Sequence, residues 1–221
     1  MRVAVLNDVH GNLPALEAVL AEVAVLEVDR IVCGGDVVAG PFPRECLGRL
    51  LDRDAAFVRG NADRKPGAWV EALLDGAALE FLRALPTSIA IDGVRFCHGS
   101  PRCDEEILTR VSPDERVGVA LGGVAETVVV GGHTHIQFER EVGGTRLANA
   151  GSVGRPYEGR PGAFWALVEG TEVELRRTPY AVDAAVALIR SSGYPEDAFV
   201  ENLLEPPDPD EVSAYFESLA A

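Results

Sequence analysis

Three short apolar runs alternate with two amphipathic segments near the start of the chain, and this alternation restricts the fold more than any other feature. The runs at 3–6, 29–33 and 55–59 have the length of buried strands. Apolar residues recur at helical spacing over 13–26, and a second helix is predicted over 43–51. Strands that alternate with helices form parallel sheets with right-handed crossovers. The sequence therefore predicts a βαβαβ unit.

The second half of the chain favours paired strands. Alternating segments flank short turns with glycine at 88–98, 136–149 and 163–176, which predicts three hairpins. One helical stretch is predicted over 68–85, and further helices are predicted after 181. Two mixed sheets that face each other, with helices outside, would accommodate both halves, so the predicted fold class is α/β.

The length of 221 residues suits one domain, so we predict a single domain over 1–221 with a C-terminal helical extension at about 181–221. The chain has no run of 18 apolar residues, and a membrane-spanning helix is not expected. The first eight residues are too short for a signal peptide and are interpreted as an opening strand. The four cysteines form no CxxC pair and are interpreted as free thiols, which favours the cytoplasm as the compartment.

Acidic residues outnumber basic ones, 35 to 20, and give a formal net charge of −15. Such a surface repels phosphate backbones and anionic membranes, so neither a nucleic-acid polymer nor a membrane is expected as a partner. A small anionic substrate would need a local positive feature. The hairpin at 163–176 could pair with a second copy, which leaves a homo-oligomer open.

The four histidines all lie where predicted strands end, in loops rich in small residues. Two aspartates and one asparagine follow strands in the same way. The carboxyl ends of strands form the ligand crevice of open α/β sheets. Imidazole, carboxylate and carboxamide groups together suit divalent first-row metals. The candidate ligands are Asp8, His10, Asp36, Asn61, His98, His133 and His135.

Their spacing and number favour a centre with two metals. Asp8 and His10 are two residues apart, as are His133 and His135, and in an extended segment such pairs point to one side. Seven ligands are too many for one tetrahedral ion but suit two ions that share a carboxylate. Each residue alone also has a structural explanation, as a helix cap, a hydrogen-bonded histidine or a left-handed turn residue. No histidine is left over for such a role, however, and the joint pattern favours metal.

Six motifs appear along the chain in a recognisable order: Asp8-Val9-His10-Gly11-Asn12, Gly35-Asp36-Val37-Val38, Gly60-Asn61-Ala62-Asp63, His98-Gly99-Ser100-Pro101, Gly132-His133-Thr134-His135 and Asn149-Ala150-Gly151-Ser152-Val153-Gly154. Over residues 3 to about 156 the chain resembles the calcineurin-like metallophosphoesterase family, and within it the small bacterial and archaeal phosphodiesterase branch. The resemblance implies a four-layer α/β/β/α sandwich, in agreement with the two sheets predicted above.

The resemblance also implies a role for each ligand. Asp8, His10 and His135 match the ligands of one metal. Asn61, His98 and His133 match those of the other. Asp36 matches the bridging carboxylate, and Asp36 and Asn61 are the expected catalytic residues. The implied cofactors are two divalent ions, with manganese as the first candidate and iron, zinc or nickel as alternatives.

With both carboxylates ionised and one bridging hydroxide, two divalent ions keep a single positive charge, which suits a phosphodiester monoanion. Small phosphodiesters are therefore the expected substrates, with nucleotides as the first candidates. We hypothesise in-line attack of that hydroxide on phosphorus, without a covalent enzyme intermediate. Asn61 would also donate to a phosphoryl oxygen. Arg102 and Arg155 follow the His98 and Ser152 motifs and are candidate substrate-binding residues, with solvated surface charges as the alternative explanation.

One departure from the family pattern matters. Many members carry histidine at the position of Ala62, where it assists the leaving group, so the source of that proton is open. Among enzymes, a diadenosine-polyphosphate hydrolase or a protein phosphatase is the alternative. A catalytically weak paralogue that binds metal or nucleotide is the alternative of another class. A metallo-β-lactamase-like hydrolase is disfavoured because the second half of its His-x-His-x-Asp-His motif does not follow His133.

Overall fold

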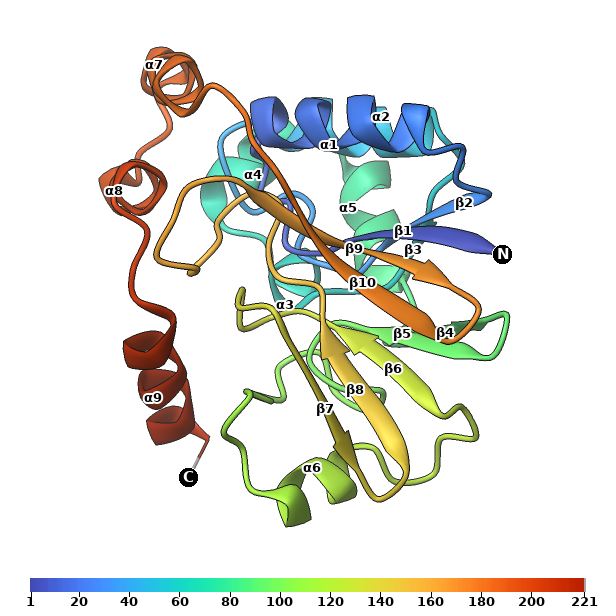
Figure 1. The fold of residues 1–221 in the computed structure, drawn as a ribbon. Helices are drawn as coiled ribbons and strands as arrows, with labels where there is room; N and C mark the ends of the chain where they lie inside the picture. Colours follow the sequence, from blue (N-terminus) through green and yellow to red (C-terminus); the bar gives the residue numbers. More distant parts are fainter. Residues whose placement is uncertain (221) are drawn as a thin grey trace.

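The fold consists of two five-stranded mixed sheets that face each other, with helices on their outer sides (Figure 1). The computed structural model describes residues 1–220. Figure 1 shows α1 (Leu13–Val25) and α2 (Pro43–Leu51) above the first sheet and α6 (Asp114–Ala120) below the second. This arrangement confirms the predicted α/β/β/α sandwich.

The first sheet contains the predicted βαβαβ unit. In this unit β1 (Arg2–Leu6) pairs in parallel with β2 (Arg30–Cys33), which pairs in parallel with β3 (Ala56–Phe57). Asn12 begins the first helix as its side chain accepts a hydrogen bond of 3.2 Å from the amide of Ala15. In spatial order the strands are β10 (Glu172–Thr178), β9 (Ala163–Glu169), β1 (Arg2–Leu6), β2 (Arg30–Cys33) and β3 (Ala56–Phe57), and the intervening helices are α1 (Leu13–Val25) and α2 (Pro43–Leu51).

The hairpin predicted at 163–176 belongs to this first sheet. Its strand β9 pairs antiparallel with both β1 and β10, and every residue of β9 except Glu169 is buried. Of the two strands of this hairpin only β10 lies at an edge of the sheet, and pairing of the hairpin with a second copy stays a prediction limited to that strand.

The second sheet joins two hairpins to a central parallel strand. The strand β6 (Val128–Gly131) lies between β5 (Val94–Cys97) and β8 (Thr145–Asn149) and is parallel to both. In spatial order the strands are β4 (Ser88–Ile91), β5 (Val94–Cys97), β6 (Val128–Gly131), β8 (Thr145–Asn149) and β7 (Phe138–Val142), and the helix α6 (Asp114–Ala120) covers the outer side.

The strand β1 is buried on both faces and anchors the molecule. Val3 and Val5 pack into the core between the two sheets, whereas Ala4 and Leu6 pack into the core under the outer helices. This alternation follows from the two-residue period of a strand. The end of β1 is therefore fixed from both sides, and so is the loop that follows it.

Two parts of the helical pattern differ from prediction. The stretch predicted as one helix over 68–85 forms α4 (Ala68–Leu73) and α5 (Gly76–Ala84), because Asp75 starts a new helix by accepting a hydrogen bond from the amide of Ala78 at 2.8 Å. A short helix, α3 (Asn61–Arg64), was not predicted.

The chain ends in three helices, α7 (Val182–Ser192), α8 (Asp197–Leu204) and α9 (Pro209–Leu219). Figure 1 shows them descending along one side of the molecule, from the level of α1 to the level of the second sheet. The cysteines in the described residues are free, as expected. No helix within residues 1–220 is long and apolar enough to span a membrane.

Candidate metal centre

The predicted ligands follow β1, β2, β3, β5 and β6, with Asn61 at the start of α3 and the others in loops. Backbone hydrogen bonds hold these loops together. The amide of Asp8 donates to the carbonyl of Gly35 at 3.0 Å, and the amide of His10 donates to the carbonyl of Asp36 at 2.9 Å. The loops of the second sheet are linked in the same way by a 2.8 Å bond from the Gly132 amide to the His98 carbonyl. The ligand positions are thus part of the backbone framework.

Five of the ligands have left-handed backbone conformations: φ is 53° at Asp8, 46° at His10, 51° at Asp36, 68° at His133 and 58° at His135. The prediction that the two Asp/His-x-His segments are extended was therefore wrong. The chain turns immediately after each strand, and this turn lets side chains from separate loops converge. Non-glycine residues with positive φ are uncommon, although Asp, Asn and His tolerate it best, and clusters of them occur at functional sites.

Asp8, His10 and His135 form one buried group of potential ligands. Asp8 Oδ1 lies 3.1 Å from His135 Nε2 and 3.6 Å from His10 Nε2. The two Nε2 atoms of these histidines are 3.1 Å apart. The three side chains therefore converge on one point.

A second group contains Asp8, Asp36 and His98. His98 Nε2 lies 3.5 Å from Asp36 Oδ2 and 3.1 Å from Asn61 Oδ1. Asp36 Oδ2 is also 3.8 Å from His10 Nε2, so this carboxylate lies between the two groups. The ring of His133 is 5.0 Å from that of His98, measured between centroids. All seven predicted ligands thus lie within one cluster.

Hydrogen bonds from Nδ1 to backbone carbonyls orient three of the histidines so that their Nε2 atoms face the carboxylates. His10 Nδ1 donates to the carbonyl of Ala39 at 3.0 Å, and His98 Nδ1 donates to that of Gly34 at 2.9 Å. His135 Nδ1 donates to the carbonyl of Arg155 at 2.6 Å. A neutral imidazole that donates from Nδ1 carries a lone pair on Nε2. Metal-binding histidines usually have this arrangement, with the second nitrogen bonded to a carbonyl.

Two features of the cluster call for a cation. The Nε2 lone pairs of His10 and His135 face each other at 3.1 Å, which is unfavourable without a proton or a metal between them. The buried Asp8 Oδ1 atom has no hydrogen-bond donor. Burying an unsatisfied carboxylate oxygen is costly, and a divalent ion would satisfy both features. The residues present therefore fit a metal.

The electrostatics of the cluster support the same conclusion. Burial raises the pKa of Asp36, but the neighbouring His98 and His10 outweigh it and lower that pKa to about 2. Burial lowers the pKa of His98, but Asp36 and Asp8 outweigh it and raise that pKa to about 10. Burial, assisted by His98, lowers the pKa of His133 to about 4. The two carboxylates thus stay ionised and attract positive charge to the site.

Asp63 fixes the backbone around Asp36 and Gly60, and the sequence did not predict this role. Its buried carboxylate accepts hydrogen bonds from the amides of Asp36 at 2.8 Å, Val37 at 3.0 Å and Gly60 at 3.0 Å. The amide of Ala62 donates to Asp36 Oδ1 at 2.8 Å. Residues 60–63 therefore orient Asp36 as well as supplying Asn61. The only pattern that includes Asp63 is its place in the Gly60-Asn61-Ala62-Asp63 motif.

A pocket of about 260 Å³ opens beside the cluster and is lined by His10, Asp36 and Asn61 among others. Of the two predicted substrate-binding arginines, the structure places Arg155 in the lining of this pocket. Arg102 does not line it, and its guanidinium is bonded to Glu106 with an Nε–Oε2 distance of 2.9 Å. A substrate contact by Arg102 stays a prediction.

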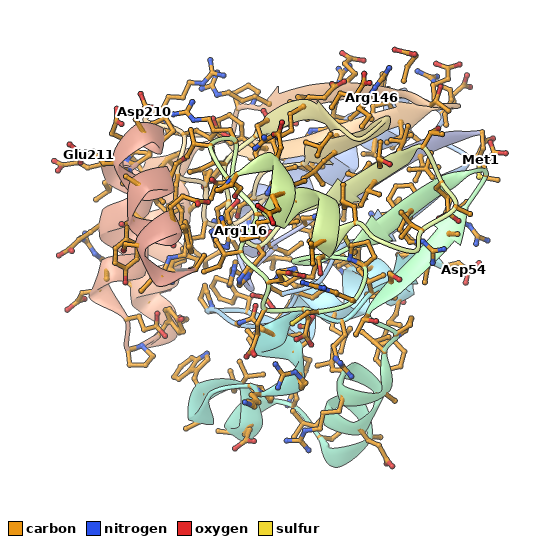
Figure 2. The ribbon with its side chains drawn as sticks, turned by 90° about the horizontal axis from the view of Figure 1, so that it is seen from below. Met1, Asp54, Arg116, Arg146, Asp210 and Glu211 are labelled. Carbon is orange, nitrogen blue, oxygen red and sulfur yellow. The ribbon has the colours of Figure 1, made fainter. Side chains whose placement is uncertain are left out.

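Aromatic residues that do not line this pocket also pack against the cluster. Tyr157 stacks on the ring of His135 with 4.7 Å between centroids, and Phe216 of α9 lies 6.4 Å from the ring of His133. Arg116 of α6 holds α9 in place through Glu217 at 2.6 Å, and Figure 2 shows Arg116 next to this helix. Sequence patterns missed these residues because none of them belongs to a motif.

A family model described as the calcineurin-like phosphoesterase superfamily domain matches residues 1–171. The chain belongs to this superfamily. The matched region contains all seven clustered side chains, and the two-sheet fold agrees with the membership. The predicted resemblance to this family is therefore confirmed.

Individual relatives extend the likeness beyond residue 171. The uncharacterized protein MJ0912 of Methanocaldococcus jannaschii is 30% identical over 232 residues, which cover 88% of this chain and 94% of that protein. A metallophosphoesterase from Sphaerobacter thermophilus has 27% identity and a TM-score of 0.81, with 93% of this chain and 100% of that chain covered. The fold also matches the hypothetical protein PH1004 of Pyrococcus horikoshii OT3, with 19% identity, a TM-score of 0.79 and coverage of 94% and 99%. Such coverage includes part of the C-terminal helical segment.

Proposed function

We propose that this protein hydrolyses phosphodiesters with the help of two divalent metal ions. One observation carries the proposal: side chains from five strand ends converge on a buried cluster in which Asp8 Oδ1 has no donor and imidazole lone pairs face one another. The similar protein from Sphaerobacter thermophilus is described as a metallophosphoesterase, which supports the reaction class.

The family to which the chain belongs implies a division of the ligands between two ions. Asp8, His10 and His135 would hold one ion. Asn61, His98 and His133 would hold the other, and Asp36, which lies between the groups, would be shared. Manganese is the first candidate, and iron, zinc and nickel accept the same donors. When bound, such a pair lowers the pKa of a water to about 7 and neutralises phosphate charge.

The protein's own residues orient the substrate. Arg155 is the one arginine or lysine that lines the described pocket, and it can pair with a phosphate oxygen. The Asn61 carboxamide has an N–H₂ group that can donate to a phosphoryl oxygen. The amide of Ala62 keeps the Asp36 carboxylate in place at 2.8 Å. One cationic side chain suits the single charge of a phosphodiester better than the double charge of a monoester.

Ala62 limits the range of leaving groups. Its methyl group lines the pocket and cannot give up a proton. A diester whose leaving group is already a weak base needs no such proton, so activated diesters should be the best substrates. The diadenosine-polyphosphate hydrolase, the protein phosphatase and the weakly catalytic binding protein remain the alternatives.

The test compares the manganese-loaded wild type with Asp36→Asn. We expect the wild type to hydrolyse bis(p-nitrophenyl) phosphate, and the variant to lose metal and at least about 100-fold in kcat/KM. Elemental analysis and the release of p-nitrophenolate provide the two measurements. Cyclic nucleotides and dinucleoside polyphosphates should be assayed in parallel to separate the substrate classes.

The matched control is Asp54→Asn, which makes the same change at an exposed aspartate that also has positive φ, 49°. It should keep wild-type metal content and activity. Wild-type metal and activity in Asp36→Asn would refute the shared-ligand role. A fully loaded wild type that hydrolyses none of these substrates would favour the binding protein instead.

A further inference from the structure

The junction between α7 and α8 forms part of the pocket beside the metal cluster. Tyr194 and Glu196 lie in this junction and line the same pocket as His10, Asp36 and Asn61. The matched family region ends at residue 171, so the junction is an addition to the family domain. The C-terminal helices therefore contribute side chains to the site as well as to the fold.

Aromatic packing holds this junction in place. The rings of Tyr194 and Trp69, which lies on α4, meet edge to face with 5.7 Å between centroids. Tyr194 also packs edge to face on the buried ring of Phe199 at 5.6 Å. The guanidinium of Arg155 lies 5.5 Å from the centre of the same Phe199 ring. Tyr194 thus forms a wall of the pocket that is braced on two sides.

Two charged groups lie at the edge of this wall. Glu196 Oε2 is 3.9 Å from Arg155 Nη1, and Arg155 Nε is buried without a partner. Burial and the adjacent Glu196 raise the pKa of Tyr194, so its hydroxyl stays neutral. The wall therefore combines aromatic rings, a carboxylate that can accept hydrogen bonds and the guanidinium of Arg155.

We propose that this junction binds the nucleoside part of a nucleotide ester, with the base against Tyr194 and Trp69, the phosphate near Arg155, and Glu196 accepting hydrogen bonds from amino or hydroxyl groups. The inference rests on the proposed phosphodiester hydrolysis and adds its substrate class. Aromatic side chains stack with any base, and a cation beside them suits the attached phosphate.

The size of the pocket supports a nucleoside over larger substrates. A volume of about 260 Å³ is below the usual range of roughly 300–1,000 Å³ for sites of drug-sized ligands. One base with its sugar is of suitable size, whereas both halves of a dinucleoside polyphosphate are not. A dinucleoside polyphosphate or a phosphorylated protein segment would extend beyond a pocket of this size, so the observations favour the mononucleotide ester.

The first experiment uses two diesters with the same leaving group, thymidine 5′-(p-nitrophenyl phosphate) and methyl p-nitrophenyl phosphate. The preference is the ratio of their kcat/KM values for the manganese-loaded protein. We expect a preference for the thymidine ester that Tyr194→Leu reduces about tenfold, mainly through KM, as expected for the loss of one stacking partner. Tyr194→Phe keeps the ring and should keep most of the preference.

The control is Tyr215→Leu, a change at an exposed tyrosine of α9 that does not line the pocket. It should leave the preference at the wild-type value. Equal kcat/KM values for the two esters in the wild type would overturn the inference, as would an identical preference in Tyr194→Leu. In both of these cases hydrolysis itself, and with it the proposed function, would stand.

The second experiment measures binding without turnover. Trp165 is fully buried, so ligand-dependent tryptophan emission reports on the partly buried Trp69. We expect thymidine 5′-monophosphate, but not inorganic phosphate, to quench this emission, and Tyr194→Leu to weaken its binding about tenfold. Such binding without hydrolysis of any diester would refute the proposed function but support the nucleoside site. Quenching that is unchanged in Tyr194→Leu would refute the site.

Discussion

At the scale of single residues, the metal cluster combines several features that cost stability. Five of its residues have positive φ, and each such conformation destabilises the fold by about 1 kcal/mol or more. The cluster also buries two carboxylates among imidazoles. These costs are tolerated because the loops are tied to one another and to strands that are buried on both faces. The framework therefore stabilises a set of loops whose conformation is unfavourable by itself but brings the ligands together.

Gly60 shows how little space this arrangement leaves. A Cβ atom at this position would overlap both Oδ1 and the amide nitrogen of Asp36. We predict that Gly60→Ala displaces the shared carboxylate, lowers metal affinity by at least about tenfold and destabilises the fold by about 1–3 kcal/mol. Metal titration and urea denaturation would measure the two effects.

Gly48 provides the control because it lies inside α2, and a Cβ atom there would meet nothing within 4 Å. Gly48→Ala should stabilise the fold by about 0.5–1 kcal/mol, since alanine loses less backbone entropy than glycine in a helix. Unchanged metal affinity in Gly60→Ala would contradict the steric argument.

At the scale of the elements, ion pairs join segments of the site that are far apart in the sequence. Asp104, in the loop after β5, pairs with Arg59 and with Arg64 of α3, both at 3.0 Å. Its carboxylate is almost fully buried. Because Asn61 begins the same short helix, this pair of contacts ties one predicted ligand to the loop that carries His98.

Asp104 also makes stability depend on pH. Burial raises its pKa, but the hydrogen bonds from Arg64 and Arg59 outweigh it, and the net pKa is lowered. A lowered carboxyl pKa stabilises the fold above the unfolded pKa of about 3.9, and this stabilisation is lost as pH falls through the folded value. We predict that Asp104→Asn costs about 2 kcal/mol at pH 7 and progressively less as the pH falls below the unfolded pKa of about 3.9.

Urea denaturation at several pH values would measure this difference. Glu105→Gln is the control, because Glu105 binds the same Arg64 at 2.8 Å but is half-exposed, and exposed pairs contribute about 0–1 kcal/mol. A cost of Asp104→Asn that does not change between pH 7 and pH 3 would rule out the ion-pair explanation.

The elements also show which parts of the site the sequence could predict. The position of each ligand followed from one rule, that parallel strands of an α/β sheet end at one edge. A polar residue directly after a predicted strand was therefore sufficient to place that residue in the candidate site. The left-handed turns at Asp8 and His133 were not predictable, because they depend on hydrogen bonds to other loops. Nor were Tyr194 and Phe216, which reach the site through packing of helices that carry no motif.

At the scale of the whole molecule, the cluster connects the two sheets. Asp8, His10, Asp36 and Asn61 follow strands of the first sheet, whereas His98, His133 and His135 follow strands of the second. A bound ion would therefore link both halves of the sandwich. In a protein of net charge −15, it would also place positive charge where two carboxylates converge.

Metal removal should consequently destabilise the whole fold. A ligand that binds only the native state adds about 2.7 kcal/mol at a free concentration of 100 times its Kd. For a protein of this size 1 kcal/mol corresponds to about 2–4 °C in Tm. We therefore predict that excess manganese raises the Tm of the chelator-treated protein by roughly 5–10 °C, as measured by calorimetry. His135→Gln removes one Nε2 metal ligand, so its Tm should rise less at the same manganese concentration. Equal Tm values of the wild type in manganese and in chelator would mean that no ion links the sheets.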